Sequence, residues 1–206
     1  MFKIPFAKPL IEDTERNEIH KVLLGDTLTH GPTCLQFEKE FANFHDVKHA
    51  ISTSNCTTAL HLALQALDIK CGDEVIVPAM THVATAHVVE HAGAKPIFVD
   101  IRSDTGCICP ESCQKAINSK TKAIIVVHFV GLPSDMEAIM AIAKKNKLKV
   151  IEDSATALGA ICNGKKSGTI GDIGCFSFYP TKHITSMEGG MAITNDDELS
   201  KKIKKM

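Results

Sequence analysis

The chain has 206 residues, of which 44% are hydrophobic and 23% are charged, and its formal net charge at pH 7 is -1. This length suffices for one large domain with a substantial core, and the composition is that of an ordinary globular protein. A nearly neutral chain gives no reason to expect nucleic acid or an anionic membrane as a partner.

The N-terminal stretch MFKIPFAKPLIEDTERNEI becomes charged too early for a signal peptide, and no apolar run is long enough to cross a bilayer. We therefore expect a cytoplasmic protein whose eight cysteines are reduced thiols. Three of them form the cluster CICPESC at 107–113, which is the one candidate zinc signal. Because it lacks C-x-x-C spacing and a nearby histidine, small core or surface thiols are the favoured interpretation, and we expect no metal.

Apolar, β-branched runs alternate along the chain with segments of helical periodicity. The predicted strands are 49–52, 74–78, 96–100, 123–128, 149–153, 174–178 and 191–194. Helices are predicted between them, most clearly at 57–67 (TTALHLALQAL) and 135–146 (DMEAIMAIAKKN). Several of the strands are continuously apolar, so the pattern predicts an α/β domain with a parallel sheet covered on both faces.

Polar residues follow several predicted strands, at the edge where parallel sheets collect their ligands. Such positions are held by 78–82, Asp100, 128–131 and 153–155, and the segment SFYPTKHITSMEGGM (177–191) ends and follows a strand in the same way. We expect these loops to line one crevice.

The segment STSNCTTALHLAL leads from the first predicted strand into a helix. Free N–H groups at a helix start attract anions, which makes this a candidate phosphate site. Simple capping by Ser54, Asn55 or Thr57 is the more common explanation of the same residues, so this signal is weak by itself. Neither the Walker nor the dinucleotide-binding glycine pattern is present.

The segment VIEDSATALGA ends a predicted strand with Glu152 and Asp153, whose side chains should point to opposite faces of the sheet. A carboxylate at this position could bind a metal, act as a base, pair with a protonated ring nitrogen or cap the following helix. The sequence alone leaves these alternatives open.

Lys182 stands in a turn after Tyr179-Pro180. An exposed loop lysine is the ordinary interpretation. A lysine near buried surface loses its proton more readily, however, and its amine can then form a Schiff base with an aldehyde. The double glycine Gly189-Gly190 predicts a tight turn that leaves room for a neighbouring segment. A helix-start anion site, a strand-end aspartate and a lysine after a serine are together the anchors that pyridoxal phosphate (PLP) needs.

With these motifs the chain resembles the sugar aminotransferases of the DegT/DnrJ/EryC1/StrS family, PLP enzymes with the aspartate-aminotransferase fold. The carrying motifs are LTHGPTCLQFEKEFA, TTALHLALQAL, GDEVIVPAMTHVATAHVVEHAGAKPIFVDI, TKAIIVVHFVGLPSDMEAI, VIEDSATALGA and GTIGDIGCFSFYPTKHITSMEGGMAITND. The resemblance implies a three-layer α/β/α fold with a mostly parallel mixed sheet. Residues 1–206 would form the PLP-binding large domain, with an N-terminal helical segment at about 1–45, and the small C-terminal domain of the family would be absent.

The cofactor-binding residues that the resemblance implies are Thr57, Thr58, His82, Asp153, Ser177 and Lys182. The threonines and the serine would bind the phosphate, and the histidine would stack on the ring. The two predicted catalytic residues are Lys182, which would hold the cofactor, and Asp153, which would keep its ring nitrogen protonated. Two departures from the family pattern are Cys56, where glycine is frequent, and Thr156, where Gln or His is often found.

The expected activity is amino transfer, with glutamate as donor, to a nucleotide-linked keto-sugar in polysaccharide or amino-sugar biosynthesis. A histidine in place of Lys182 would instead indicate the related sugar dehydratases. The resemblance also implies a homodimer with its active sites at the subunit interface. Two alternatives are a catalytically weak cofactor-binding or dimerising remnant and a metal-dependent enzyme that uses Asp153, His82 and His128.

Overall fold

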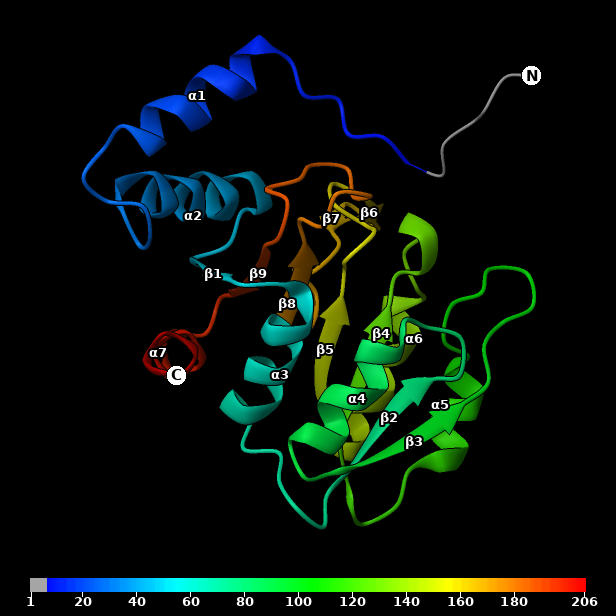
Figure 1. Ribbon diagram of the computed structural model, residues 1–206. Helices are drawn as coiled ribbons and strands as arrows, with labels where there is room; N and C mark the ends of the chain where they lie inside the picture. The colour runs from blue at the N-terminus through cyan, green and yellow to red at the C-terminus, as the bar shows by residue number, and fades with distance from the viewer. Residues whose placement is uncertain (1–6) are drawn as a thin grey trace.

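The computed structural model describes residues 7–206, which form one sheet between helical layers (Figure 1). The sheet has seven strands in the order β1-β9-β8-β5-β4-β2-β3. Their bounds are His49–Thr53 (β1), Glu74–Pro78 (β2), Lys95–Val99 (β3), Thr121–Val127 (β4), Lys149–Asp153 (β5), Ile173–Ser177 (β8) and Gly190–Thr194 (β9). Among these strands, β9 alone runs against the others, because it pairs antiparallel with both β1 and β8.

Helices cover both faces of the sheet (Figure 1). The α-helices are Asp13–Leu23 (α1), Pro32–His45 (α2), Cys56–Ala66 (α3), Val83–His91 (α4), Pro110–Ala116 (α5), Met136–Asn146 (α6) and Asp197–Lys205 (α7). The α3, α4 and α7 helices pack on one face, and α2, α5 and α6 on the other. The predicted three-layer architecture with a mostly parallel mixed sheet is therefore confirmed.

Strand β4 shows why the sequence folds into three layers. Ala123 and Ile125 contribute to the core beneath α3 and α4, while Ile124 and Val126 contribute to the core beneath α5 and α6. All four side chains are fully buried. A strand in this environment needs apolar residues at consecutive positions, which is the continuous pattern that the sequence presents.

One part of the chain differs from expectation. A short hairpin of β6 (Ile161–Cys162) and β7 (Lys165–Lys166) was not predicted. The helices α1 and α2 fall within the predicted N-terminal helical segment, whose residues 1–6 lie outside the described residues. No residue of α1 is buried. Among the described residues, no helix is both long and apolar enough to span a membrane.

The parallel strands all end at one edge of the sheet, and β9 begins there because it runs the other way. Gly190, the first residue of β9, is paired with Thr53 at the end of β1 and with Ser177 at the end of β8. The loops that follow β1, β2, β5 and β8 and the loop that enters β9 therefore meet at this edge. The predicted crevice is confirmed for residues of 78–82, 153–155 and 177–191, whereas Asp100 and 128–131 do not line it.

Candidate functional site

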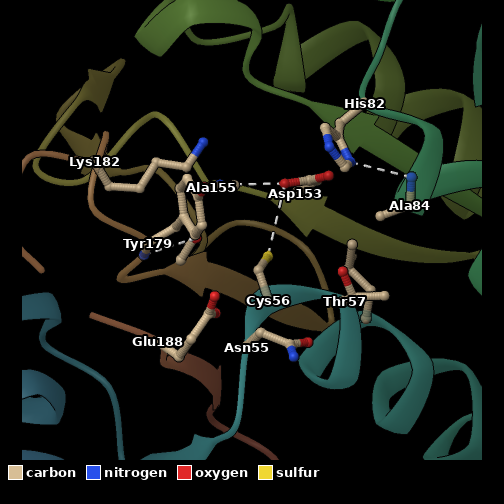
Figure 2. A pocket seen from close by; sticks show the side chains of 12 residues that line it. Asn55, Cys56, Thr57, His82, Ala84, Asp153, Ala155, Tyr179, Lys182 and Glu188 are labelled. Atoms are coloured by element: carbon tan, nitrogen blue, oxygen red, sulfur yellow. Dashed lines mark hydrogen bonds between the residues drawn. The ribbon is translucent and has the colours of Figure 1, made fainter. Parts of the chain in front are cut away.

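A hollow of about 420 Å³ opens at this edge. Of the predicted site residues, those that line it are Thr57, His82, Asp153, Ser177 and Lys182. Figure 2 shows the amine of Lys182 pointing toward the side of the hollow where Asp153 lies. A volume of this size is within the range of small-molecule and cofactor sites.

Asp153 lies at the base of the hollow, at the end of β5, and its side chain is almost completely buried. Its Oδ1 accepts a hydrogen bond from the Ala155 N–H at 3.2 Å, and its Oδ2 accepts one from the Thr85 hydroxyl at 2.9 Å. Burial raises the pKa of this carboxyl, while the two hydrogen bonds and the nearby Lys182 lower it. The carboxylate is therefore held in a fixed orientation by one donor from the loop after β5 and one from the first turn of α4.

Glu152 precedes Asp153 and points to the opposite face of the sheet, as the alternation of the strand predicted. Its Oε2 lies 2.9 Å from Nε2 of His128, and both side chains are fully buried. Because Nδ1 of this histidine accepts a hydrogen bond from the Ser134 N–H, its ring proton is on Nε2 and is donated to Glu152. Glu152 thus has a structural role on the opposite face of the sheet and does not line the hollow.

The start of α3 forms one wall of the hollow. Asn55 caps this helix, and its Oδ1 accepts hydrogen bonds from the backbone N–H and the hydroxyl of Thr58 at 2.8 and 3.0 Å. Thr58 is occupied by this cap and does not line the hollow, in contrast to Thr57. The backbone N–H groups of Cys56 and Thr57 have no hydrogen-bond partner among residues 7–206. The first turn of α3 therefore offers two N–H groups and one hydroxyl to an anion.

Gly190 makes room for this turn. A Cβ atom at this position would lie 2.6 Å from both the Asn55 carbonyl oxygen and the Cys56 nitrogen. No side chain fits at such distances, so the backbone of β9 can pass the helix start only as glycine. The predicted clearance role of the double glycine is confirmed for this residue.

Lys182 lies in a turn closed by a 2.9 Å hydrogen bond from its own N–H to the Tyr179 carbonyl. Its amine makes no hydrogen bond or ion pair with any of the described residues. In the same loop, the Ser177 hydroxyl accepts a 3.3 Å hydrogen bond from the Tyr179 N–H. Glu188 directs its carboxylate into the hollow from the approach to β9 (Figure 2). The amine of Lys182 is thus free to react and faces two carboxylates.

His82 is the N-cap of α4, and its Nδ1 accepts a hydrogen bond from the Ala84 N–H at 3.2 Å. This bond fixes the imidazole at the rim of the hollow, where the ring is exposed (Figure 2). The structure does not bring His82 and Asp153 together with His128, because both ring nitrogens of His128 are bonded on the other side of the sheet. The described residues therefore do not form the His82, Asp153 and His128 cluster that the metal-dependent alternative requires.

Sequence reasoning missed four residues that shape the site: Cys56, Thr85, Tyr179 and Glu188. Cys56 is buried with its sulfur 4.0 Å from Asp153 Oδ1. The predicted helix start could have indicated Cys56, and the turn around Lys182 could have indicated Tyr179 and Glu188. Nothing local indicates Thr85, because it is 68 positions away from the carboxylate that it contacts.

A sequence profile of the DegT/DnrJ/EryC1/StrS aminotransferase family matches residues 9–206. The chain belongs to this family. It is 44% identical to the spore coat polysaccharide biosynthesis protein SpsC of Bacillus subtilis over 201 residues, 98% of this chain and 52% of that protein. It is 46% identical to the UDP-N-acetyl-3-dehydro-alpha-D-glucosamine 3-aminotransferase of Acidithiobacillus ferrooxidans over 187 residues, 90% of this chain and 51% of that enzyme.

A solved GDP-4-keto-6-deoxymannose-3-dehydratase with PLP and glutamate trapped together superposes with a TM-score of 0.93 at 34% identity. The match covers 98% of this chain and 54% of that protein. The resemblance and the fold class predicted from the sequence are therefore confirmed. The chain spans about half the length of the curated relatives that it matches.

Proposed function

We propose that this protein is a PLP-dependent aminotransferase that acts on a nucleotide-linked keto-sugar. The observation that carries the proposal is the arrangement of the hollow, in which the amine of Lys182 and the buried carboxylate of Asp153 face one space beside the unbonded N–H groups in the first turn of α3. These three groups match an aldehyde, a protonated ring nitrogen and a phosphate.

The described residues fit PLP chemically. The unbonded amine of Lys182 would hold the aldehyde carbon, and Asp153 would hold the ring nitrogen. Thr57 and the first N–H groups of α3 would bind the phosphate together with Ser177, and the imidazole of His82 would cover the ring. Thr58 contributes to this set through the Asn55 cap rather than by contact. When bound, the cofactor supplies an electron sink for charge that develops on the substrate carbon.

Two side chains around the hollow, Lys182 and Asp153, would carry out the proton chemistry. Lys182, once released by the incoming amine, would remove the proton from the substrate carbon as a general base and return it as a general acid. Asp153 would keep a proton on the ring nitrogen by its negative charge. A lysine at position 182 favours transamination over dehydration, because a primary amine can exchange with the amine of the donor and an imidazole cannot.

The substrate class rests on the relatives. The A. ferrooxidans enzyme is named for the amination of a UDP-linked dehydro-sugar, and the dehydratase structure contains glutamate together with PLP. We propose a nucleotide-linked keto-sugar as acceptor and glutamate as donor for this protein. The predicted cytoplasmic location stays a prediction.

We further propose that residues 1–206 act as the large domain of such an enzyme and that the protein is a homodimer. Large apolar side chains on and after α1 support an assembled state, since Leu23, Leu24 and Leu28 are each more than 60% exposed. Sedimentation at two protein concentrations tests this, and a monomer at micromolar concentration would contradict it.

Absorbance spectroscopy tests the cofactor assignment. Purified protein mixed with PLP should acquire a visible absorption band that is stable to gel filtration and becomes covalently fixed to Lys182 by borohydride, as located by peptide mass spectrometry. Lys182→Ala should lose the fixed label. Lys201→Ala is a matched control, because Lys201 is exposed and pairs with Glu198 on α7, far from the hollow.

Three outcomes separate the alternatives. No band in the wild type overturns the PLP assignment. A band that glutamate bleaches, with formation of 2-oxoglutarate, supports the aminotransferase. A band that glutamate leaves unchanged in the homodimer favours the cofactor-binding remnant.

A further inference from the structure

We infer that Thr85, oriented by Thr81, is the positioning residue that holds the Asp153 carboxylate in place against the cofactor ring. The inference rests on the proposed function only in assuming that a cofactor ring binds beside Asp153. The hydrogen bonds that carry it are present in the protein itself.

The direction of the hydrogen bonds is fixed by the protons available. The Thr85 hydroxyl has a single proton and lies 2.9 Å from Asp153 Oδ2, an acceptor without a proton when ionised. The Thr81 hydroxyl lies 2.8 Å from the Thr85 hydroxyl. Since the proton of Thr85 is given to the carboxylate, Thr81 must be the donor in the second bond. The relay therefore runs from Thr81 through Thr85 to Asp153.

Among the described residues, the Thr85 hydroxyl has no hydrogen-bond partner other than Asp153 and Thr81. Its side chain is fully buried, and it stands in the first turn of α4, where its N–H donates to the His82 carbonyl at 3.0 Å. A buried hydroxyl needs a partner, and the described residues offer this one only the carboxylate and Thr81. The same turn carries His82 at the rim, so α4 fixes the ring position and the carboxylate orientation together.

The relay matters because Asp153 is buried. Desolvation alone would favour the protonated, neutral acid, which cannot stabilise a charged ring nitrogen. The pKa of Asp153 is raised by burial and lowered by the Ala155 N–H and then by the Thr85 hydroxyl. Of these two donors, only the hydroxyl is a side chain that mutation can remove without moving the strand.

The other titratable groups around the carboxylate come from four elements. They are Cys56 on α3, His128 after β4, Cys175 on β8 and Lys182 in the loop after β8. Glu152 precedes it on β5 but points to the other face. None of these groups lies on α4, so replacing Thr85 leaves their side chains in place.

The first experiment uses the protein without cofactor. The carboxyl carbon of Asp153 is followed by ¹³C NMR as the pH is varied, with Asp153→Asn to assign the signal. Thr85→Val removes the hydroxyl at nearly constant shape and should move the titration midpoint upward by about one pH unit, because a hydrogen bond to a charged group is lost. Thr85→Ser should restore the wild-type midpoint, and Thr81→Val should give an intermediate shift.

A matched control is Thr194→Val. Thr194 is also buried, and its hydroxyl donates to the Asp172 carbonyl at the opposite edge of the sheet, 2.8 Å away. This variant should lose stability but leave the Asp153 midpoint unchanged. An unchanged midpoint in Thr85→Val, or the same shift in Thr194→Val, would overturn the inference.

The second experiment measures PLP affinity by absorbance across a pH series. Thr85→Val should bind about tenfold more weakly at neutral pH, and its affinity should begin to fall with acid at a higher pH than in the wild type. A parallel weakening at every pH would overturn the electrostatic role. If the wild type binds no PLP, the proposed function fails, and the NMR midpoint still decides the role of Thr85.

Discussion

Gly190 has no room for a side chain, because the Asn55 and Cys56 backbone passes directly in front of it. We predict that Gly190→Ala displaces the start of α3, lowers stability by about 1–3 kcal/mol and abolishes PLP retention. Gly164→Ala is the control, because Gly164 has positive φ but open space around it. It should cost about 1 kcal/mol of left-handed strain and leave PLP retention intact. Urea denaturation and gel filtration with PLP measure both, and retention in Gly190→Ala would contradict the prediction.

The cysteines differ in reactivity because they differ in burial. Desolvation raises the pKa of the Cys113 thiol to about 12 and raises that of Cys56 well above its ordinary value, whereas Cys71 is exposed. The thiolate is the reactive species. We predict that iodoacetamide at pH 8 labels Cys71 well before Cys56 or Cys113 in the folded protein, as mapped by peptide mass spectrometry. Equal rates for the three in the native state would be inconsistent with this, while denatured protein should lose the difference.

At the level of helices and strands, burial explains what could be predicted from sequence. All seven strands of the main sheet were predicted, most clearly the interior strand β4, whose two faces are covered and whose apolar run is continuous, whereas the edge strand β3 leaves Phe98 exposed. The β6–β7 hairpin was missed because its strands are two residues long, although its Asn163-Gly164 turn was a recognisable hairpin signal. The contact between Thr85 and Asp153 depends on how α4 packs across the sheet. This packing cannot be predicted from the local sequence pattern.

Glu152 links β5 to the loop that enters β8. Its two oxygens accept hydrogen bonds from His128 and from the N–H groups of Gly168, Ile170 and Gly171. Glu152→Gln would point an NH₂ group at some of these donors, so we predict a loss of about 3 kcal/mol in stability. Glu198→Gln on exposed α7 should change stability by less than about 0.5 kcal/mol. Chemical denaturation measures both, and a near-neutral Glu152→Gln would show that the four donors do not depend on the charge.

The stability of the whole molecule should depend on pH through His45. Burial lowers the pKa of this histidine; its Nδ1–H donates to the Phe41 carbonyl at 3.0 Å, and its Nε2 is buried without a partner among the described residues. Lys166 and Asp46 are the charged groups beside it. Above about pH 6.5 both folded and unfolded states hold it neutral. Below that pH only the unfolded chain takes up the proton, so stability falls until the lowered folded pKa is reached.

We predict that His45→Phe flattens this acid loss between about pH 6.5 and 5, whereas His87→Gln, at an exposed position on α4, does not. Asp153 acts in the opposite sense, because a raised folded pKa stabilises the protein in acid. The quantity to measure is therefore the difference between each variant and the wild type in unfolding free energy against pH. An unchanged acid slope in His45→Phe would contradict the prediction.

The pairing of β9 with β1 also sets the order in which this protein can be completed during synthesis. His49 pairs with Thr194, so the two partners emerge from the ribosome 145 residues apart. Contacts of such long range form late and slow folding. The turn of Asn55 and Cys56 is held against Gly190 by this last pairing. A nascent chain halted before residue 190 would therefore carry α1 to α6 without the completed anion site at the start of α3, and it could not bind its cofactor until β9 has been synthesised.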